Sequence, residues 1–387
     1  MTRTADVLVI GGGLHGLSAA LQIARRGASV VLLERHRLGR HSSGASAAGV
    51  RTRGRAREEL PASLIAMEMW HNIEDWLGDD CGFHSHGQMM VAETEAELDE
   101  LQRHVDCLIA DGFTNEEIIH ANELRDIVPA LAPQCIGASF ARHDGAADPH
   151  RTVAAFRRAA LAAGADIIEG AGVSAIQRNA GSWQVHAGDD CFEAPMLVNA
   201  AGAWGGQIAA MAGDDIPMGY KCSMMIVTER VAPFVKPTIA SARRGLSFKQ
   251  TNQGTLLIGG GHQGRPDFAN ERADIDARSL AKAAAAAVAL FPSIPRLRIV
   301  RSWAGLEARS SDELAVVGLS PNTPGLLHLF GFSGHGFQLV PSIGVAGAEL
   351  LLTGHTDIVL AGLEPDRLMG GKPVSPPSHA DPADLSE

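Results

Sequence analysis

The pattern of apolar and polar residues predicts alternating strands and helices from the start of the chain. The apolar run 6–10 is short enough for a buried strand, and residues 14–26 carry apolar positions at helical spacing. Gly27 then provides a helix stop, and a second apolar run follows at 29–33. This order of strand, helix and strand predicts a parallel sheet that begins at the N-terminus.

Helical spacing and β-rich runs continue along the rest of the chain. Helices are predicted at 60–77, 93–111, 152–163, 280–290 and 343–352. Strands are predicted at 87–92, 165–168, 184–186, 196–199, 220–229, 255–258 and 326–330. The runs from 220 onward predict a second sheet. The tail from Gly370 is rich in Pro, Ser and Asp, which is typical of disorder.

The length and composition are those of a globular protein with two lobes. The chain has 387 residues, more than one hydrophobic core normally holds. A formal net charge of −11 argues against a nucleic-acid partner. No apolar run reaches the roughly 20 residues of a membrane span, and the first strand begins where a signal peptide would lie. We therefore expect a cytoplasmic enzyme, either free or bound peripherally at the inner membrane face.

The cysteines and histidines predict neither a disulfide framework nor a metal site. Five cysteines stand far apart without a CxxC pair, which favours free buried thiols in a reducing compartment. Cys81, His84 and His86 lie close together, but no fourth ligand follows at a suitable spacing. We therefore expect no bound metal.

A glycine motif between the first strand and the first helix predicts a dinucleotide site. Gly11 permits the tight turn, Gly13 lets the backbone approach a pyrophosphate, and Gly16 lets helix and strand pack closely. The helix N-terminus would face the phosphates with its partial positive charge. Glu34 ends the second strand, where a carboxylate for ribose hydroxyls is expected. The motif alone does not distinguish NAD from FAD.

A second glycine-rich segment, 331–338, stands too far along the chain to belong to the same local unit. A cofactor site built from both ends of a chain is typical of FAD-dependent amine oxidoreductases. Together with 42–46, 198–204 and 303–306, the two glycine segments resemble the D-amino-acid-oxidase-like flavoprotein superfamily, in its sarcosine and glycine oxidase branch. Within that branch, the chain is similar to β subunits of dehydrogenases that act on opines, on hydroxyproline or proline, and on sarcosine.

The resemblance implies an α/β fold with a discontinuous Rossmann-like FAD-binding domain. That domain would comprise residues 1–86, 148–215 and 320–369. Residues 87–147 and 216–319 would form an inserted α+β substrate domain built on an antiparallel sheet. Residues 370–387 would form the disordered tail.

The resemblance also implies which residues bind FAD. They are Gly11, Gly13, Leu14, His15, Gly16, Glu34, Arg35, Ser42, Ser43, Ser46, Val173, Ala201, Gly202, Trp204, Gly305, Gly334, His335, Gly336, Phe337 and Gln338. A helix starting near Pro341 would point its N-terminus at the flavin. No cysteine stands near Gly305, where a relative bonds its flavin covalently, so we expect non-covalent FAD. His150 could carry a second flavin, FMN, at a subunit interface; alternatively, residues 148–150 only cap a helix.

The expected reaction is oxidation of a C–N bond in an amino acid or secondary amine by hydride transfer to flavin N5. Arg51 is the first candidate for binding a substrate carboxylate, and Arg53 is the second. Gln338 could donate to the same carboxylate, His262 could line the cavity, and Tyr220 could cap it. Each has a structural alternative: a surface or phosphate-binding arginine, a glutamine bonded to flavin or backbone, a loop histidine and a packed strand residue.

The absence of a lysine from residues 255–262 favours a dehydrogenase over an oxidase. A relative uses a lysine in that stretch to promote the reaction of reduced flavin with oxygen, although Lys249 or Arg265 could substitute here. Electrons would then pass to a partner subunit or a quinone. Three alternatives remain: an oxygen-using oxidase that produces hydrogen peroxide, a non-catalytic FAD-containing electron-relay subunit, and an NAD-dependent dehydrogenase.

Overall fold

The first sheet joins strands from both ends of the chain. The computed structural model describes residues 2–294 and 296–371, and it orders this six-stranded sheet β21-β22-β13-β2-β3-β9. The strands are β2 (Val7–Ile10), β3 (Val30–Glu34), β9 (Asp166–Glu169), β13 (Met196–Asn199), β21 (Val316–Leu319) and β22 (Leu326–Phe330). All neighbours are parallel except β21 and β22. Strands that are far apart in the sequence are therefore neighbours in this sheet. The first apolar run forms β2, which pairs with β13 from the middle of the chain, and β13 in turn pairs with β22.

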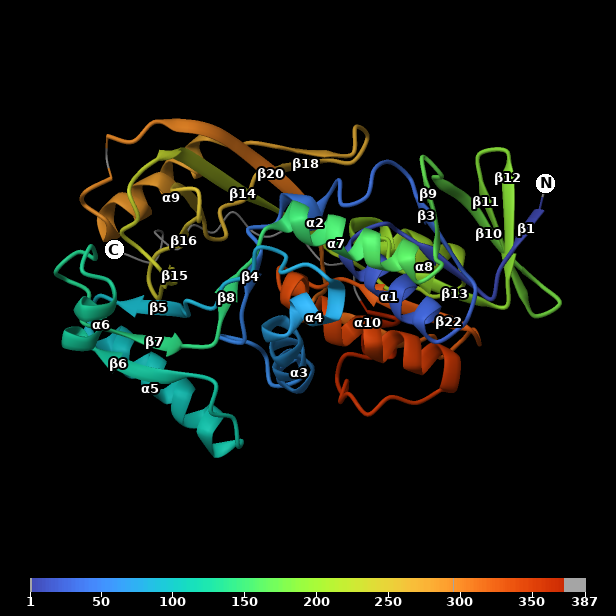
Figure 1. Cartoon of the computed structure of the whole chain (residues 1–387), viewed down its shortest axis with the longest axis horizontal. Coiled ribbons are helices and arrows are strands. Elements are labelled where there is room, and N and C mark those ends of the chain that lie inside the picture. The colour runs from blue at the N-terminus through green and yellow to red at the C-terminus, as the bar shows by residue number, and fades with distance from the viewer. Residues whose placement is uncertain (1, 295, 372–387) are drawn as a thin grey trace.

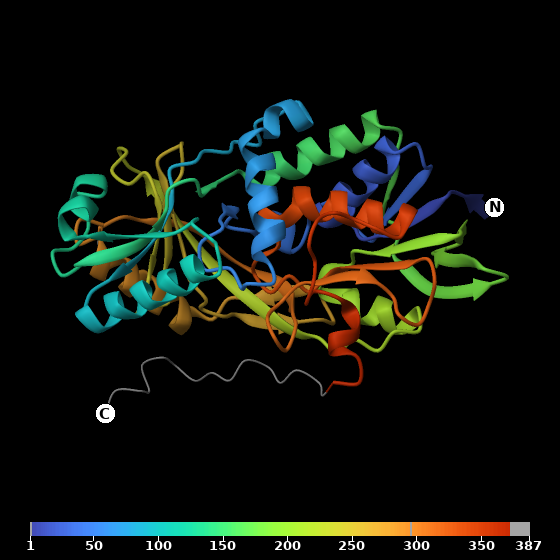
Figure 2. The same cartoon turned by 90° about the horizontal axis from the view of Figure 1, so that it is seen from below.

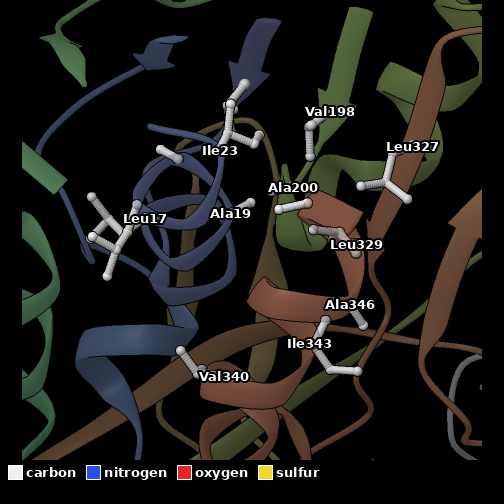
Figure 3. Close-up of a cluster of buried hydrophobic side chains, with 14 of the residues drawn as sticks. Leu17, Ala19, Ile23, Val198, Ala200, Leu327, Leu329, Val340, Ile343 and Ala346 are labelled. Atoms are coloured by element: carbon white, nitrogen blue, oxygen red, sulfur yellow. The ribbon is translucent and has the colours of Figure 1, made fainter. Parts of the chain in front are cut away.

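Helices cover one face of this sheet. They are α1 (Leu14–Arg25), α3 (Leu60–His71), α4 (Ile73–Leu77), α7 (Pro149–Ala162) and α10 (Gly336–Thr353). Figure 2 shows α1, α7 and α10 on the same side of the sheet, and α1 packs against both of the others. Leu17 and Ile23 of α1, Ile343 of α10 and Val198 of β13 belong to one fully buried cluster, part of which Figure 3 shows. The helical spacing seen in the sequence thus buries one stripe of each helix.

A small sheet covers the opposite face. Its order is β1-β12-β11-β10, with β1 (Thr2–Thr4), β10 (Val173–Asn179), β11 (Ser182–Ala187) and β12 (Asp190–Ala194); α8 (Gly205–Met211) lies beside it. Val7 and Val9 of β2 face the helices, whereas Leu8 and Ile10 face the small sheet. Because alternate residues of a strand point to opposite faces, a strand that is apolar at every position is buried on both sides.

The second large sheet has eight strands in the order β20-β14-β17-β16-β15-β5-β7-β6. They are β5 (Gln88–Ala92), β6 (Glu117–His120), β7 (Gly137–Ala141), β14 (Gly219–Arg230), β15 (Thr238–Ser241), β16 (Ser247–Gln250), β17 (Thr255–Gly259) and β20 (Ile299–Arg309). All neighbours are antiparallel except β15 and β5. The helices packed around it are α5 (Glu95–Ala110), α6 (Ala121–Ile127) and α9 (Ala277–Leu290). Figure 1 shows this sheet at one end of an elongated molecule and the six-stranded sheet at the other.

Short elements complete the fold. They are α2 (Ser42–Ala45), β4 (Gly49–Val50) paired with β8 (Gly145–Ala146), the hairpin β18 (Arg265–Asp267) and β19 (Arg272–Asp274), and the 3-10 turns η1 (Gly202–Trp204) and η2 (Pro365–Leu368). The α/β class predicted from the sequence is confirmed. The domain ranges stay a prediction, and residues 372–387 of the predicted disordered tail lie outside the described residues.

Two predicted helices have different bounds in the structure. The helix predicted at 60–77 divides into α3 and α4, because Asn72 leaves the helical conformation at ψ 23°. The last helix begins at Gly336, several residues before Pro341, so the proline lies inside it. By length and composition α10 could cross a membrane, but 61% of it is buried inside the fold. It is therefore the central core helix of the first lobe.

Replacing Gly344 by alanine tests the contact between α1 and α10. An added Cβ would lie 2.0 Å from Ser18 Oγ, so the helices would have to separate. We expect a loss of about 1–3 kcal/mol in the free energy of unfolding, measured by denaturant titration. Gly347→Ala is the matched control, because its Cβ would meet only leucine methyl groups at 3.2–3.3 Å. Equal losses in both variants would contradict the interpretation.

Candidate cofactor and substrate site

The glycine turn between β2 and α1 leaves no room for side chains at two of the three motif glycines, Gly11 and Gly16. Gly11 adopts φ +110°, and an added Cβ would lie 2.4 Å from the carbonyl oxygen of Ala200 on the neighbouring strand. A Cβ on Gly16 would lie 1.9 Å from the carbonyl oxygen of Gly11. Gly13 is less crowded, because a Cβ there would meet only Ser43 Oγ at 3.1 Å. The roles assigned to the glycines from the motif thus match the geometry.

The N-terminus of α1 is held from two sides. The Gly12 N–H donates to Glu34 Oε2 at 2.7 Å, and the Leu14 N–H donates to Ser43 Oγ at 3.0 Å. The remaining N–H groups of the first turn have no acceptor within the helix. They face a cavity lined by Gly13, Leu14, Ser42 and Ser43. This arrangement suits a phosphate group.

A cavity of about 130 Å³ extends from this turn along the end of β3. Among its lining residues are Gly11, Gly13, Leu14, His15, Glu34, Arg35, Ser42, Ser43, Val173, Ala201, Gly202 and Trp204. Glu271, on the β18–β19 hairpin, pairs with Arg35 and His36 at its edge. Candidate ligand atoms of His36, His41 and Glu271 lie within 4.8 Å of one another and could hold a metal ion. Glu271 is, however, already paired with a guanidinium.

A larger cavity of about 500 Å³ continues from the first and shares Leu14, His15, Ser42, Ser43, Gly202 and Phe332 with it. One wall consists of α2 and the loop that follows it, and another consists of Gly331, Gly334, Gly336 and Phe337. Strands of the eight-stranded sheet form the floor. The cavity is therefore closed by both ends of the chain and by the second sheet.

His15 joins the two helix N-termini at the junction of the cavities. Its ring stacks on Phe332 with centroids 3.6 Å apart, and its Nε2 lies 3.0 Å from the carbonyl oxygen of Gly336. Burial lowers the pKa of His15 to about 3, so the ring is neutral and Nε2 carries the proton that it donates. Its buried Nδ1 makes no hydrogen bond within the residues the structure describes. An acceptor atom is thus available to a bound molecule.

Arg51 and Arg53 both line the larger cavity. Burial lowers the pKa of Arg51, and burial together with the neighbouring Arg51 charge lowers the pKa of Arg53 to about 10, so both stay charged near neutral pH. Asp144 fixes this loop by accepting hydrogen bonds from Thr52 N, Thr52 Oγ1 and Arg53 N. Arg53 Nε is buried without a hydrogen-bond partner in the described chain. The two guanidinium groups can therefore bind an anion.

Gln338 is turned away from the cavity. Its amide donates to Ser63 O at 2.7 Å and accepts from Ser63 Oγ at 3.0 Å, and it is fully buried against α3. Arg55 donates from Nη2 to His335 O at 2.9 Å and pairs through Nη1 with Glu59 Oε2 at 3.4 Å. The same Glu59 oxygen lies 3.0 Å from His335 Nδ1. Gln338 and His335 thus fix the position of the glycine loop, and neither is among the residues that line the cavities.

The structure brings most of the other predicted cofactor residues to the cavities. Ser46, Gly305, Gly334, Gly336 and Phe337 line the larger one, whereas Gly16 packs behind the first turn. Tyr220 and His262 are not among the described lining residues of either cavity. The Tyr220 ring instead packs on Phe268, with centroids 4.2 Å apart. The structure thus places Gln338, Tyr220 and His262 outside the described lining of both cavities, and their substrate contacts stay a prediction.

Sequence reasoning passed over two charged residues of the larger cavity. Lys249, considered only as a substitute, lines the floor, and its Nζ donates to the carbonyl oxygen of Ala47. Burial lowers the pKa of Lys249 to about 8. Glu307, two residues beyond Gly305, lines the wall near Gly334. Period-two alternation along their strands was the available signal: in β16, Phe248 packs in the core opposite Lys249.

The described residues fit an FAD molecule. Glycines that exclude Cβ atoms, a free helix N-terminus, an orphaned buried acceptor on His15 and an elongated double cavity are all present. His150, the predicted FMN position, is exposed at the start of α7, where Asp148 caps the helix by accepting from Arg151 N at 2.9 Å. The predicted helix cap is confirmed.

Comparisons with known proteins agree with this geometry. Residues 6–350 match the family model described as FAD dependent oxidoreductase. The chain is 25% identical over 374 residues to sarcosine oxidase subunit beta of Rhizobium meliloti (strain 1021), covering 95% of this chain and 89% of that protein. It is 25% identical over 378 residues to glycine oxidase of Geobacillus kaustophilus, covering 96% and 99%. The structure of L-proline dehydrogenase from P. horikoshii superposes with a TM-score of 0.88 at 26% identity, covering 95% and 98%. The resemblance predicted from the two glycine segments is confirmed.

His15→Phe tests whether the orphaned nitrogen contacts the cofactor. Phenylalanine keeps the stacking on Phe332 but removes both ring nitrogens. We expect FAD to bind about 10-fold more weakly, because up to two hydrogen bonds of about 1 kcal/mol each are lost. Fluorescence titration of the apoprotein with FAD measures this. Unchanged affinity would show that Nδ1 faces no cofactor atom.

Proposed function

Because the chain belongs to the FAD-dependent oxidoreductase family, we propose that it oxidises the C–N bond of an α-amino acid or a secondary amine. The observation that carries the proposal is the larger cavity, where Arg51 and Arg53 line the space beside the glycine loop 331–336. The named activities of the relatives, on sarcosine, glycine and L-proline, support the same substrate class. Proline, hydroxyproline, sarcosine and opines are all candidates.

FAD would lie along both cavities. Gly11, Gly13 and Ser43 would hold its pyrophosphate, Glu34 would bind its ribose, and the loop at Gly334 would surround its flavin. When bound, the flavin supplies a two-electron acceptor for hydride. The N-terminus of α10, an 18-residue helix beginning at Gly336, adds partial positive charge at that loop. That charge stabilises negative charge developing beside the loop.

Arg51 and Arg53 would bind the substrate carboxylate and thereby orient the α-carbon. Two guanidinium groups on one loop can form paired hydrogen bonds with a carboxylate. Asp144 and the Arg55–Glu59 pair behind the loop fix its position, so little reorganisation is needed on binding. Met90 and Met225 contribute apolar surface to the same cavity. Such surface favours the neutral form of the substrate amine, which is the form that can lose hydride.

We further propose that electrons leave through a partner subunit or a quinone. The relative named as a subunit beta, and those named sarcosine dehydrogenase and L-proline dehydrogenase, support this route. Lys249 favours the alternative of an oxygen-using oxidase, because a buried ammonium in the cavity stabilises an anionic oxygen species. The exposed position of His150 leaves room for FMN at a subunit interface.

We expect FAD to be bound without a covalent link. None of the described residues lining either cavity is a cysteine, and Gly305 packs beside Ala45. Acid precipitation should therefore release all the flavin into the supernatant. A yellow protein pellet would contradict this expectation.

Arg51→Ala should raise the KM for the amino acid roughly 10- to 100-fold, because a charge-assisted hydrogen bond is lost. FAD content should not change. Arg57→Ala is the matched control, since Arg57 is exposed on the same loop and pairs with Asp111 at the surface. Steady-state kinetics on both variants decide the point. An unchanged KM in Arg51→Ala would remove this residue from substrate binding.

Anaerobic mixing with proline, hydroxyproline, sarcosine, glycine, D-amino acids and opines tests the proposed function directly. At least one of them should bleach the flavin. Colour should then return slowly in air and rapidly with a dye acceptor. Rapid return in air would instead establish an oxidase, and a flavin that no amine bleaches would favour a non-catalytic electron-relay subunit.

A further inference from the structure

Glu307 is the one carboxylic acid among the described residues that line the larger cavity. It lies on β20, where it pairs across the sheet with Lys221 of β14. Its Oε1 accepts a hydrogen bond from Gly334 N at 2.8 Å. Its Oε2 makes no hydrogen bond or ion pair with any residue that the structure describes. One oxygen thus anchors the side chain to the glycine loop, and the other is free to meet a bound molecule.

The charges around Glu307 do not neutralise it. Lys221 Nζ bonds Ser333 O at 3.2 Å and pairs with Glu313 Oε2 at 3.4 Å, so its ammonium is directed at other acceptors. The other ionisable groups that line the cavity are His15 on α1, Arg51 and Arg53 on the loop after α2, and Lys249 on β16. Burial raises the pKa of Glu307, whereas the Gly334 N–H and the Lys221 charge oppose this rise. The carboxylate is therefore a better proton acceptor than an exposed one.

The proposed substrate brings a proton that must be removed. A free amino acid carries a carboxylate and an ammonium, and a protonated nitrogen has no lone pair to form the C=N bond as hydride leaves. Arg51 and Arg53 provide cations for the carboxylate, and Glu307 provides an anion in the same cavity. The cavity thus offers positive charge to the carboxylate and negative charge to the ammonium of a zwitterionic amino acid.

We propose, on the basis of the proposed function, that Glu307 is the catalytic base that deprotonates the substrate amine. An N–H bond of the ammonium breaks, its electron pair stays on nitrogen as the lone pair, and the proton forms an O–H bond with Glu307 Oε2. The neutral amine is the form that can give up hydride from its α-carbon, and the flavin of the proposed function would be the two-electron acceptor. No further reactant takes part in the proton transfer.

The other groups that line the cavity cannot replace Glu307 in this step. His15 has a pKa of about 3, so its neutral ring keeps the Nε2 proton that it donates to the carbonyl oxygen of Gly336 and does not accept a second proton near neutral pH. Arg51 and Arg53 stay protonated. Lys249, with a pKa lowered to about 8, is still mostly charged at neutral pH and donates to Ala47. Glu307 is the remaining acceptor among the described lining residues.

Stopped-flow reduction of the bound flavin under anaerobic conditions gives the first readout. With the best amino acid from the substrate screen, Glu307→Gln should lower the reduction rate about 100-fold at pH 7. In the wild type the rate of flavin reduction should fall as pH drops through the pKa of Glu307. In the variant this fall in rate at low pH should be absent. Glu313→Gln is the matched control, because Glu313 also neighbours Lys221 but does not line the cavity.

Binding of an unreactive analogue gives a second readout that needs no turnover. α-Aminoisobutyrate keeps the ammonium and the carboxylate but has no α-hydrogen, whereas isobutyrate lacks the ammonium. Titration followed by the flavin absorption spectrum should show that Glu307→Gln weakens α-aminoisobutyrate binding at least 10-fold and leaves isobutyrate binding unchanged. Equal weakening of both ligands would show that Glu307 only supports the loop, and would overturn the proposal.

The outcomes separate this proposal from the proposed function. If amino acids bleach the wild-type flavin and Glu307→Gln retains both the rate and its pH dependence, only the assignment of Glu307 fails. If no amine bleaches the wild-type flavin, the proposed function fails, and the assignment of Glu307 fails with it. A slow Glu307→Gln variant with normal FAD content and the altered pH profile supports both.

Discussion

The crossing of α1 and α10 is the contact on which the rest of the structure depends. Gly344 brings the two helices together at Ser18, and Ser18 Oγ donates to the carbonyl oxygen of Val340 at 2.9 Å. This close approach fixes the first and the last helix of the lobe against each other. Both N-termini then open toward the same elongated space, so two glycine turns from opposite ends of the chain form one site.

A buried polar network joins the glycine loop, positioned by α10, to the loop that carries Arg51. Arg55 and Glu59 pair with side-chain exposures of 1% and 0%, and both contact His335. Burial would raise the pKa of Glu59, but its hydrogen bond with His335 and the Arg55 charge lower it overall. Removing one partner would leave the other charged and buried, which costs several kcal/mol. The loop that carries Arg51 is therefore held to the glycine loop by Arg55, Glu59 and His335, which are not among the described residues that line the cavities.

Sequence patterns were sufficient to place the residues of the nucleotide-binding part of the site, but they were insufficient to place those of the substrate-binding part. Gly11, Gly13 and Glu34 could be placed because their roles depend on local backbone geometry between adjacent elements. The substrate floor depends on how β5, β15 and β16 align, and no local pattern gives that register. Gln338 shows where prediction from the sequence stops. The sequence places it in the glycine-rich segment 331–338, but in the structure it belongs to α10, which directs its side chain toward Ser63. The predicted helix bounds were wrong at Asn72, where the helix is interrupted, and near Pro341, which lies inside α10, because a local pattern does not fix where a helix begins or ends.

The placement of α10 also governs when the protein can acquire its prosthetic group. The ribosome synthesises β2 and α1 well before residues 336–353 of α10. A nascent chain therefore displays half of a nucleotide site until α10 has been made. Tight binding of FAD must follow the synthesis of α10, and it will then stabilise the assembled lobe by mass action. Cellular flavin supply and the yield of folded protein are coupled by this late closing helix.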